Sequence, residues 1–165
     1  MDVKLTDEQR KAIEGLFPVD EDKIKFTPDY YKKVNIPEEL IPTFIVRPYN
    51  QSEKARFKKI QNKAMTQASR TFKTMPQDKQ ISPEEIGLLV YEGLDHEELK
   101  SLVRGCIVGI ENWVSSGLTE IVYKGDKNGI CKEQFNKLHD KVVDEIGGYL
   151  NKISGLLDIE ALSLE

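Results

Sequence analysis

Apolar residues recur at helical spacing through the stretch 99–114, and this pattern predicts the helix on which the rest of the chain packs. They return at every third or fourth position and form one stripe, which we expect to be buried: Leu99, Leu102, Val103, Cys106, Ile107, Ile110, Trp113 and Val114. Gly117 then interrupts the pattern. Residues 119–123 alternate and include β-branched side chains, which predicts a short strand or an extended segment.

A polar cap and an apolar stripe predict a long helix from residue 51 to residue 72 or just beyond. Asn50 and Glu53 are three positions apart, which is the spacing of a capping box at the start of a helix. The residues expected on the buried face of this helix are Phe57, Ile60, Ala64, Met65, Ala68 and Phe72.

Two further helix starts and one long apolar pattern complete the domain. One helix is expected to begin after Ser82, which is the N-cap, with Pro83 at its first position and Glu85 at its third. This helix is expected to end at Gly93. Asp95 and Glu98 cap the helix that contains the stretch 99–114. A polar turn over residues 124–129 leads to a final helix, whose apolar positions run from Phe135 to Ile153.

The first part of the chain shows no steady periodicity. Thr6 and Gln9 have capping-box spacing and predict a short helix. Residues 19–42 are rich in charge and proline, and we interpret them as an irregular arm. Its aromatic residues either pack on the same chain or contact a partner. The run between Pro42 and Pro48 is β-prone, and we expect an edge strand there because proline cannot donate to a strand ladder.

Together these patterns predict a mainly α protein. We expect a small helical domain of four to five helices with one or two short strands and an extended N-terminal arm. The short helix and the arm would occupy residues 1–41, and the helical domain residues 42–165. A chain of 165 residues can bury a core without a disulfide or a metal, so Cys106 and Cys131 are interpreted as free thiols. No apolar run approaches the ~20 residues of a membrane span, which favours the cytoplasm.

Charge is unevenly distributed along the chain. The net charge is −3 over residues 1–46, +7 over residues 47–80 and −8 over residues 81–165. The basic block could follow a phosphate backbone. However, the whole chain is acidic, with a pI of about 5.4, and no aromatic residues interleave with the basic ones. We therefore favour a solvated helix face that pairs with the acidic part of the same or a neighbouring molecule.

Candidate catalytic and metal-binding groups are sparse. His96 and His139 have no second ligand at metal spacing. Residues 126–130 resemble the centre of a calcium loop, but the first and twelfth positions of that loop would be Lys124 and Phe135, which supply no carboxylate. We therefore interpret Asn128 and Gly129 as a turn. The sequence contains no glycine-rich phosphate loop, and no serine or cysteine has a histidine near it in sequence. We expect no enzyme activity, no cofactor and no metal.

Several pieces of the chain follow one another in an informative order. The segment 42–48 leads into a polar-capped helix, a helix closes at Trp113, a short strand and a last amphipathic helix follow, and the end contains Leu162, Ser163 and Glu165. Over about residues 38–165 this order resembles the small tail assembly chaperones of long-tailed bacteriophages. The resemblance implies a helical protein of the bacterial host cytoplasm that binds the long helical tape measure protein. Such a protein keeps its partner soluble during tail assembly and can form homo-oligomers.

A chaperone for an amphipathic partner needs exposed apolar surface bounded by charge. The candidates are aromatic residues of the arm, apolar residues near the basic block and basic side chains of that block: Tyr30, Tyr31, Phe44, Val46, Phe57, Arg47, Lys58, Lys59 and Lys63. Each apolar candidate can instead belong to the core or pack on its own chain. In a homo-oligomer, the basic block of one copy would face the acidic half of the next.

Two other functions fit the same patterns. A structural virion component, such as a head or head–tail joining protein, would use the arm to contact its neighbours and would remain in finished particles. A nucleic-acid-binding protein would depend on the basic helix 51–73 alone and would bind DNA with a strong salt dependence.

Overall fold

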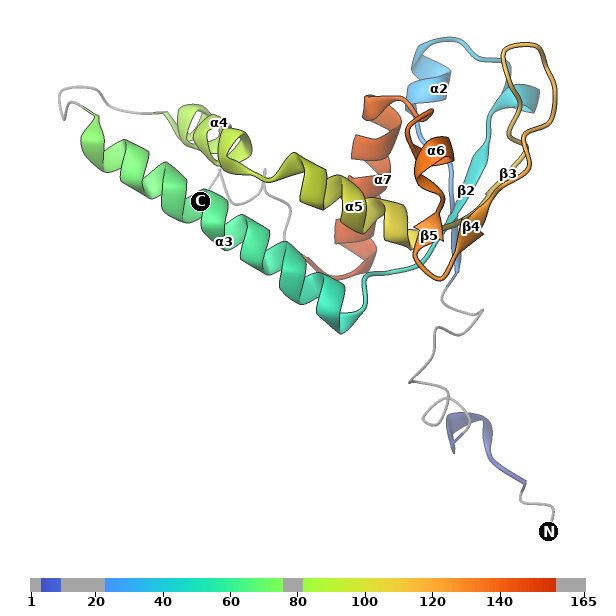
Figure 1. Ribbon diagram of the computed structural model, residues 1–165, viewed down its shortest axis with the longest axis horizontal. Coiled ribbons are helices and arrows are strands. Elements are labelled where there is room, and N and C mark those ends of the chain that lie inside the picture. Colours follow the sequence, from blue (N-terminus) through green and yellow to red (C-terminus); the bar gives the residue numbers. More distant parts are fainter. Residues whose placement is uncertain (1–3, 10–22, 76–81, 157–165) are drawn as a thin grey trace.

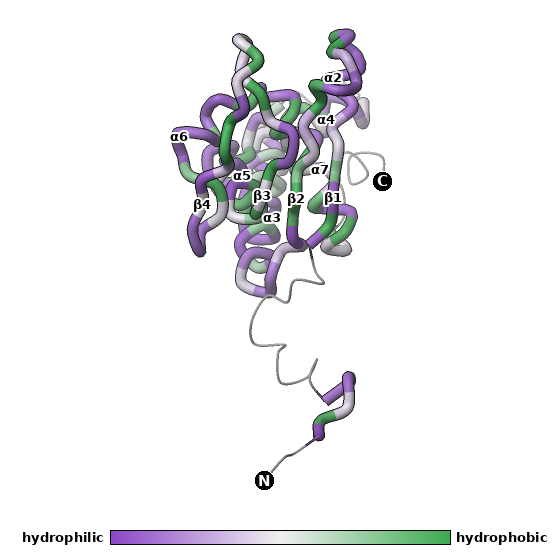
Figure 2. The backbone as a smooth tube through the Cα atoms, turned by 90° about the vertical axis from the view of Figure 1, so that its right-hand side faces the viewer, coloured by the Kyte–Doolittle hydropathy of each residue, from purple (hydrophilic) through white to green (hydrophobic). Residues whose placement is uncertain are grey.

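A three-stranded antiparallel sheet lies at one end of the computed structural model, which describes residues 4–9, 23–75 and 82–156 (Figure 1). Its strands are β1 (Ile24–Phe26), β2 (Thr43–Val46) and β3 (Ile107–Glu111), and they lie side by side in that order (Figure 2). The expected edge strand was therefore wrong, because β2 is the central strand. Pro42 and Pro48 both lie outside β2, so neither removes a donor from its ladders.

Residues 23–41, which were expected to form part of an irregular arm, belong to the body of the protein. After β1 they form α2 (Tyr30–Lys33) and the short 3₁₀ helix η2 (Glu38–Leu40). The ring of Phe26 stacks on that of Tyr149, with centroids 4.3 Å apart. The boundary expected between residues 41 and 42 thus runs between two strands of one sheet. Residues 10–22 lie outside the described part of the chain, as does the tail after residue 156.

The predicted caps are confirmed. Thr6 and Gln9 form the expected reciprocal pair, in which each backbone N–H donates to the other side chain, at 3.0 and 3.2 Å. Asn50 and Glu53 form the capping box of α3 (Gln51–Thr74). Ser82 and Asp95 accept backbone hydrogen bonds at the starts of α4 (Pro83–Gly93) and α5 (His96–Cys106). These starts depend on neighbouring residues only, which is why the sequence predicts them.

The buried face of α3 was predicted correctly except at two positions. Its buried apolar residues are Phe57, Ile60, Ala64 and Ala68. Met65 and Phe72, by contrast, are 44% and 50% exposed. Met65 lies about 100° around the helix from Ala64, beyond the stripe that faces the neighbouring helices.

The helix expected over residues 99–114 was also wrong in its second half, because α5 ends at Cys106 and β3 follows without a loop. Three of the five residues of β3 are β-branched, and Ile107 and Gly109 point into the protein while their neighbours are less buried. Pairing with β2 supplies the backbone hydrogen bonds that the helix would have supplied. Residues 119–123 form no named strand, and within the described chain their only pairing is the isolated antiparallel bridge between Glu120 and Val114.

The final helix of the prediction is divided in two. The hairpin β4 (Gly125–Asp126) and β5 (Gly129–Ile130) forms the expected turn and is followed by α6 (Lys132–Phe135) and α7 (Asp140–Ile153). His139 separates the helices and caps α7, because its Nδ1 accepts a hydrogen bond of 3.1 Å from the backbone N–H of Lys141. The described chain is therefore mainly helical, as predicted, but its sheet is a larger part of the fold than one or two short strands.

Helix α7 connects the first part of the chain to the core. The carboxylate of Glu145 accepts hydrogen bonds from the backbone N–H groups of Asp29 and Tyr30, at 3.1 and 3.0 Å. The ring of Tyr30 stacks on that of His139, with centroids 4.5 Å apart. The described aromatic residues of the expected arm therefore pack on their own chain, which was one of the two alternatives.

Candidate partner-binding surface

Helices α3 and α4 form a hairpin that extends away from the sheet (Figure 1). More than half of the large apolar side chains that are exposed in the described chain lie on this hairpin or directly after α3. They are Met65, Phe72, Met75, Ile86, Leu88 and Tyr91, which we call the hairpin apolar set. Leu88 and Tyr91 are 57% and 55% exposed, so a partner could bury much of their surface.

Helix α3 is basic on its exposed surface. It carries seven basic residues: Lys54, Arg56, Lys58, Lys59, Lys63, Arg70 and Lys73. Its single acidic residue, Glu53, is buried. Only Arg56 among these cations forms an ion pair with a described residue, the carboxylate of Glu98 on α5. The rest of this positive charge is available to a partner.

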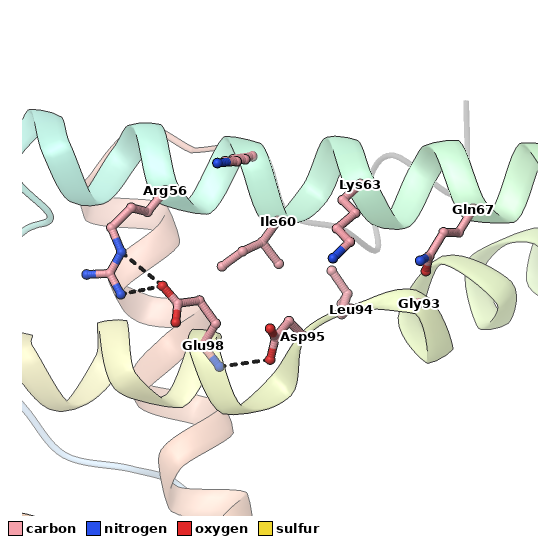
Figure 3. Close-up of a pocket in the computed structure, with 9 residues that line it drawn as sticks. Arg56, Ile60, Lys63, Gln67, Gly93, Leu94, Asp95 and Glu98 are labelled. Carbon is pink, nitrogen blue, oxygen red and sulfur yellow. Dashed lines mark hydrogen bonds and ion pairs between the residues drawn. The ribbon is translucent and has the colours of Figure 1, made fainter.

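A groove of about 340 Å³ lies where α3 meets the corner between α4 and α5 (Figure 3). Its lining, which defines the corner groove, is Arg56, Lys59, Ile60, Lys63, Gln67, Gly93, Leu94, Asp95 and Glu98. The side chain of Lys63 points from α3 toward Leu94, and that of Gln67 points toward Gly93 (Figure 3). The ion pair between Arg56 and Glu98 closes one end.

A second groove of about 470 Å³ lies between α5 and α7. Tyr91 and Leu99 contribute apolar walls, and α7 contributes Gly147 and Gly148. Asn151 also lines it, and the buried Oδ1 atom of this residue has no hydrogen-bond partner. Gly147 and Gly148 are consecutive residues in the interior of α7. Helix α7 continues through both, and a Cβ atom on Gly147 would lie 3.4 Å from the side chain of Val103.

The structure divides the predicted partner-binding residues into three groups. Phe44, Val46 and Phe57 are 0%, 0% and 2% exposed, so they belong to the core, which was the alternative for each of them. Tyr30 and Tyr31 are partly buried and pack against the core. The third group consists of the basic residues, whose side chains do not lie together on one part of the surface.

The predicted lysines lie on different sides of α3. Lys59 and Lys63 are four positions apart and share the corner groove. Lys58 is exposed but does not line this groove, because it is about 100° around the helix from Lys59. Of the three predicted lysines, only Lys59 and Lys63 therefore lie next to each other in one groove.

Arg47 is a structural residue. Its Nη1 atom lies 2.7 Å from Glu53 Oε1, and its Nη2 atom donates to Glu53 Oε2 at 3.2 Å and to the carbonyl oxygen of Gly105 at 2.9 Å. The two side chains are only 17% and 11% exposed. Burial alone would lower the pKa of Arg47, but the hydrogen bond with Glu53 and nearby negative charge outweigh burial and raise it. Arg47 is thus held as a cation inside the protein.

The unfolding free energy should fall as the pH rises above about 9. Burial raises the pKa of the Cys106 thiol from 9.0 to about 12, and the negative charge of Glu53 adds to this shift. Burial likewise raises the pKa of Tyr31 from 10.0 to about 12. These groups ionise in the unfolded chain first, so the unfolded state binds fewer protons and the loss approaches about 1.4 kcal/mol per pH unit per group.

This alkaline destabilisation is measurable by urea unfolding between pH 8 and pH 11. In the variant Cys106→Ala the decrease should begin only near pH 10, where the tyrosines ionise in the unfolded chain. An unfolding free energy that stays constant over this range would contradict the prediction.

Met65, Phe72, Leu88 and Tyr91 were not predicted as partner-binding residues. Met65 and Phe72 were assigned to the core, although one signal argued against this assignment for Met65. Ala64 and Met65 are consecutive, so they lie about 100° apart and cannot both be central to one buried stripe. For Leu88 and Tyr91 the sequence contains no pattern that indicates exposure, because their exposure depends on how α4 is oriented against α3.

Comparison of the chain with models of known protein families, with curated proteins and with solved structures found no match. None of the helices in the described residues is long and apolar enough to cross a membrane. Within residues 4–9, 23–75 and 82–156, no group of three or more His, Cys, Asp or Glu side chains could hold a metal ion. Arguments about function therefore depend on the chemistry of the hairpin and its grooves.

Proposed function

We propose that this protein is a tail assembly chaperone of a long-tailed bacteriophage, which binds the tape measure protein and keeps it soluble while the tail assembles. The observation that best supports the proposal is the hairpin apolar set, exposed on two helices that extend from the body of the protein. A chaperone shields apolar surface of its partner with apolar surface of its own. The order of sequence pieces that resembles the phage chaperones supplies the identity of the partner.

The hairpin is suited to an amphipathic helix. The members of the hairpin apolar set are 37–57% exposed, so covering one of them contributes roughly half of the ~1.5–3 kcal/mol of a full burial. A partner must therefore cover several of them together to offset the cost of association. The lysines and arginines of α3 make the hairpin positively charged, which opposes self-association of the free protein. The proposal therefore places the partner helix along α3 and α4.

Co-expression with the tape measure protein of the same genome tests this function. We expect a soluble complex by size-exclusion chromatography with light scattering, and an insoluble partner when it is expressed alone. The double variant Leu88→Ser, Phe72→Ser should leave the partner insoluble. Both side chains are at least half exposed, so each substitution should change stability by only about 0.5 kcal/mol.

A matched control is available on another part of the surface. Leu118 and Val122 are 65% and 69% exposed and lie outside the hairpin, so Leu118→Ser, Val122→Ser removes similar apolar surface. This control should keep the partner soluble. If the hairpin variant does so equally well, the hairpin is not the binding surface. Detection of the protein in finished particles would instead indicate a structural virion component.

A further inference from the structure

We propose that the corner groove binds an acidic side chain of the partner, so that the bound segment is an amphipathic helix with Asp or Glu beside its apolar stripe. This inference rests on the proposed function, because it specifies the chemistry of the partner that the hairpin binds.

Two of the three cations that line the corner groove form no ion pair with its carboxylates. Of its two carboxylates, Glu98 pairs with Arg56, and Asp95 Oδ1 accepts a hydrogen bond of 3.1 Å from the backbone N–H of Glu98. Neither Lys59 nor Lys63 forms an ion pair within the described chain. Two like charges four positions apart on a helix repel each other, and an anion between them removes this repulsion.

The remaining lining suits a carboxylate on an apolar stem. Ile60 and Leu94 are 8% and 7% exposed and form an apolar base beneath the lysines. The side-chain amide of Gln67, at the other end of the groove, can donate a hydrogen bond to the same carboxylate (Figure 3). A glutamate has this combination of aliphatic stem and anionic end, and hydrogen bonds to its charge are stronger than neutral ones.

The balance of charge favours a protein segment over a nucleic acid. Three cations of the groove, Arg56, Lys59 and Lys63, face two carboxylates, Asp95 and Glu98, which leaves one net positive charge. One carboxylate matches this charge. A nucleic acid backbone would bring several phosphates close to Asp95 and Glu98 and would be repelled by them.

Two synthetic helical peptides provide the test. They share one apolar stripe and differ only in their flanking residues, which are glutamate in one and lysine in the other. With the full chain at low salt, fluorescence anisotropy should show that the glutamate peptide binds about 10-fold tighter or more. The variant Lys59→Glu, Lys63→Glu should remove this preference.

The variant Lys132→Glu, Lys137→Glu is the matched control. It makes the same change of charge at two exposed lysines that lie outside the hairpin and do not line the corner groove. It should alter the affinity for the glutamate peptide by less than about 3-fold. Equal losses in the two variants would show a general charge effect and overturn the proposal, as would equal binding of the two peptides to the unmodified chain.

Three further measurements distinguish other occupants of the groove. Binding of duplex DNA that Lys59→Glu, Lys63→Glu abolishes would reassign the groove to nucleic acid, and loss of a homo-oligomer in that variant would reassign it to a second copy. Tighter peptide binding by a chain that ends at Leu156 would identify residues 157–165 as the occupant. Each of these results would overturn the proposal. Because the peptides contain no tape measure sequence, the co-expression experiment can fail or succeed independently of them.

Discussion

Replacement of Arg47 with methionine should lower the free energy of unfolding by about 3–5 kcal/mol. The substitution leaves the carboxylate of Glu53 inside the protein without its cation, and it removes the hydrogen bond to the carbonyl oxygen of Gly105. The methionine fills much of the same volume, so the loss reports the unpaired charge more than a cavity. Urea unfolding followed by circular dichroism at neutral pH measures this difference.

Two controls separate burial from charge. Arg56→Met breaks the ion pair with Glu98, whose side chains are 45% and 40% exposed, and should cost no more than about 1 kcal/mol. The double variant Arg47→Met, Glu53→Gln should be more stable than Arg47→Met alone, because the unpaired charge is gone. A loss below about 1 kcal/mol for Arg47→Met would contradict a buried role for this pair.

Gly129→Ala should destabilise the protein by about 3 kcal/mol or more, or prevent folding. Gly129 has a φ angle of +89°, which L-residues with a Cβ atom rarely adopt. An added Cβ atom would lie 2.1 Å from the carbonyl oxygen of Arg104 and 2.8 Å from the Cα atom of Gly105. Both are backbone atoms of α5, so the β5 hairpin would have to move away from the core.

Gly148→Ala is the matched substitution. Gly148 is in the interior of α7, and a Cβ atom added there would meet nothing within 4 Å beyond the backbone of its own helix. Alanine is favoured over glycine in a helix by about 0.5–1 kcal/mol, so this variant should be more stable than the unmodified chain. The midpoint temperature of thermal unfolding should therefore fall in Gly129→Ala and rise in Gly148→Ala. A small effect of Gly129→Ala would mean that the hairpin is not held against α5.

The sequence predicts the elements whose signals are local. The caps at Asn50, Ser82 and Asp95 require only residues three positions away, and each starts a helix where it was expected. The change from helix to strand after Cys106 is different, because the apolar positions of 99–114 satisfy a helical period. The strand forms there since β2, far away in the sequence, offers a partner for its backbone.

The candidate surface could be predicted only in part for the same reason. Lys59 and Lys63 were among the expected partner-binding residues, and helical geometry alone separates them from Lys58. The apolar candidates Phe44 and Val46 were assigned to a surface because they lie near the basic block in the sequence, with a place in the core as the alternative. Their burial follows from the central place of β2, which only the pairing with β1 and β3 establishes.

The direct continuation of α5 into β3 has a consequence for binding. The first turn of α5 lines the corner groove, and its last residue is followed at once by a strand hydrogen-bonded to β2. With no loop between them, the groove is anchored to the sheet by one uninterrupted backbone. The backbone that lines the groove would therefore be ordered before a partner binds, and little backbone conformational entropy of this protein would be lost when the complex forms.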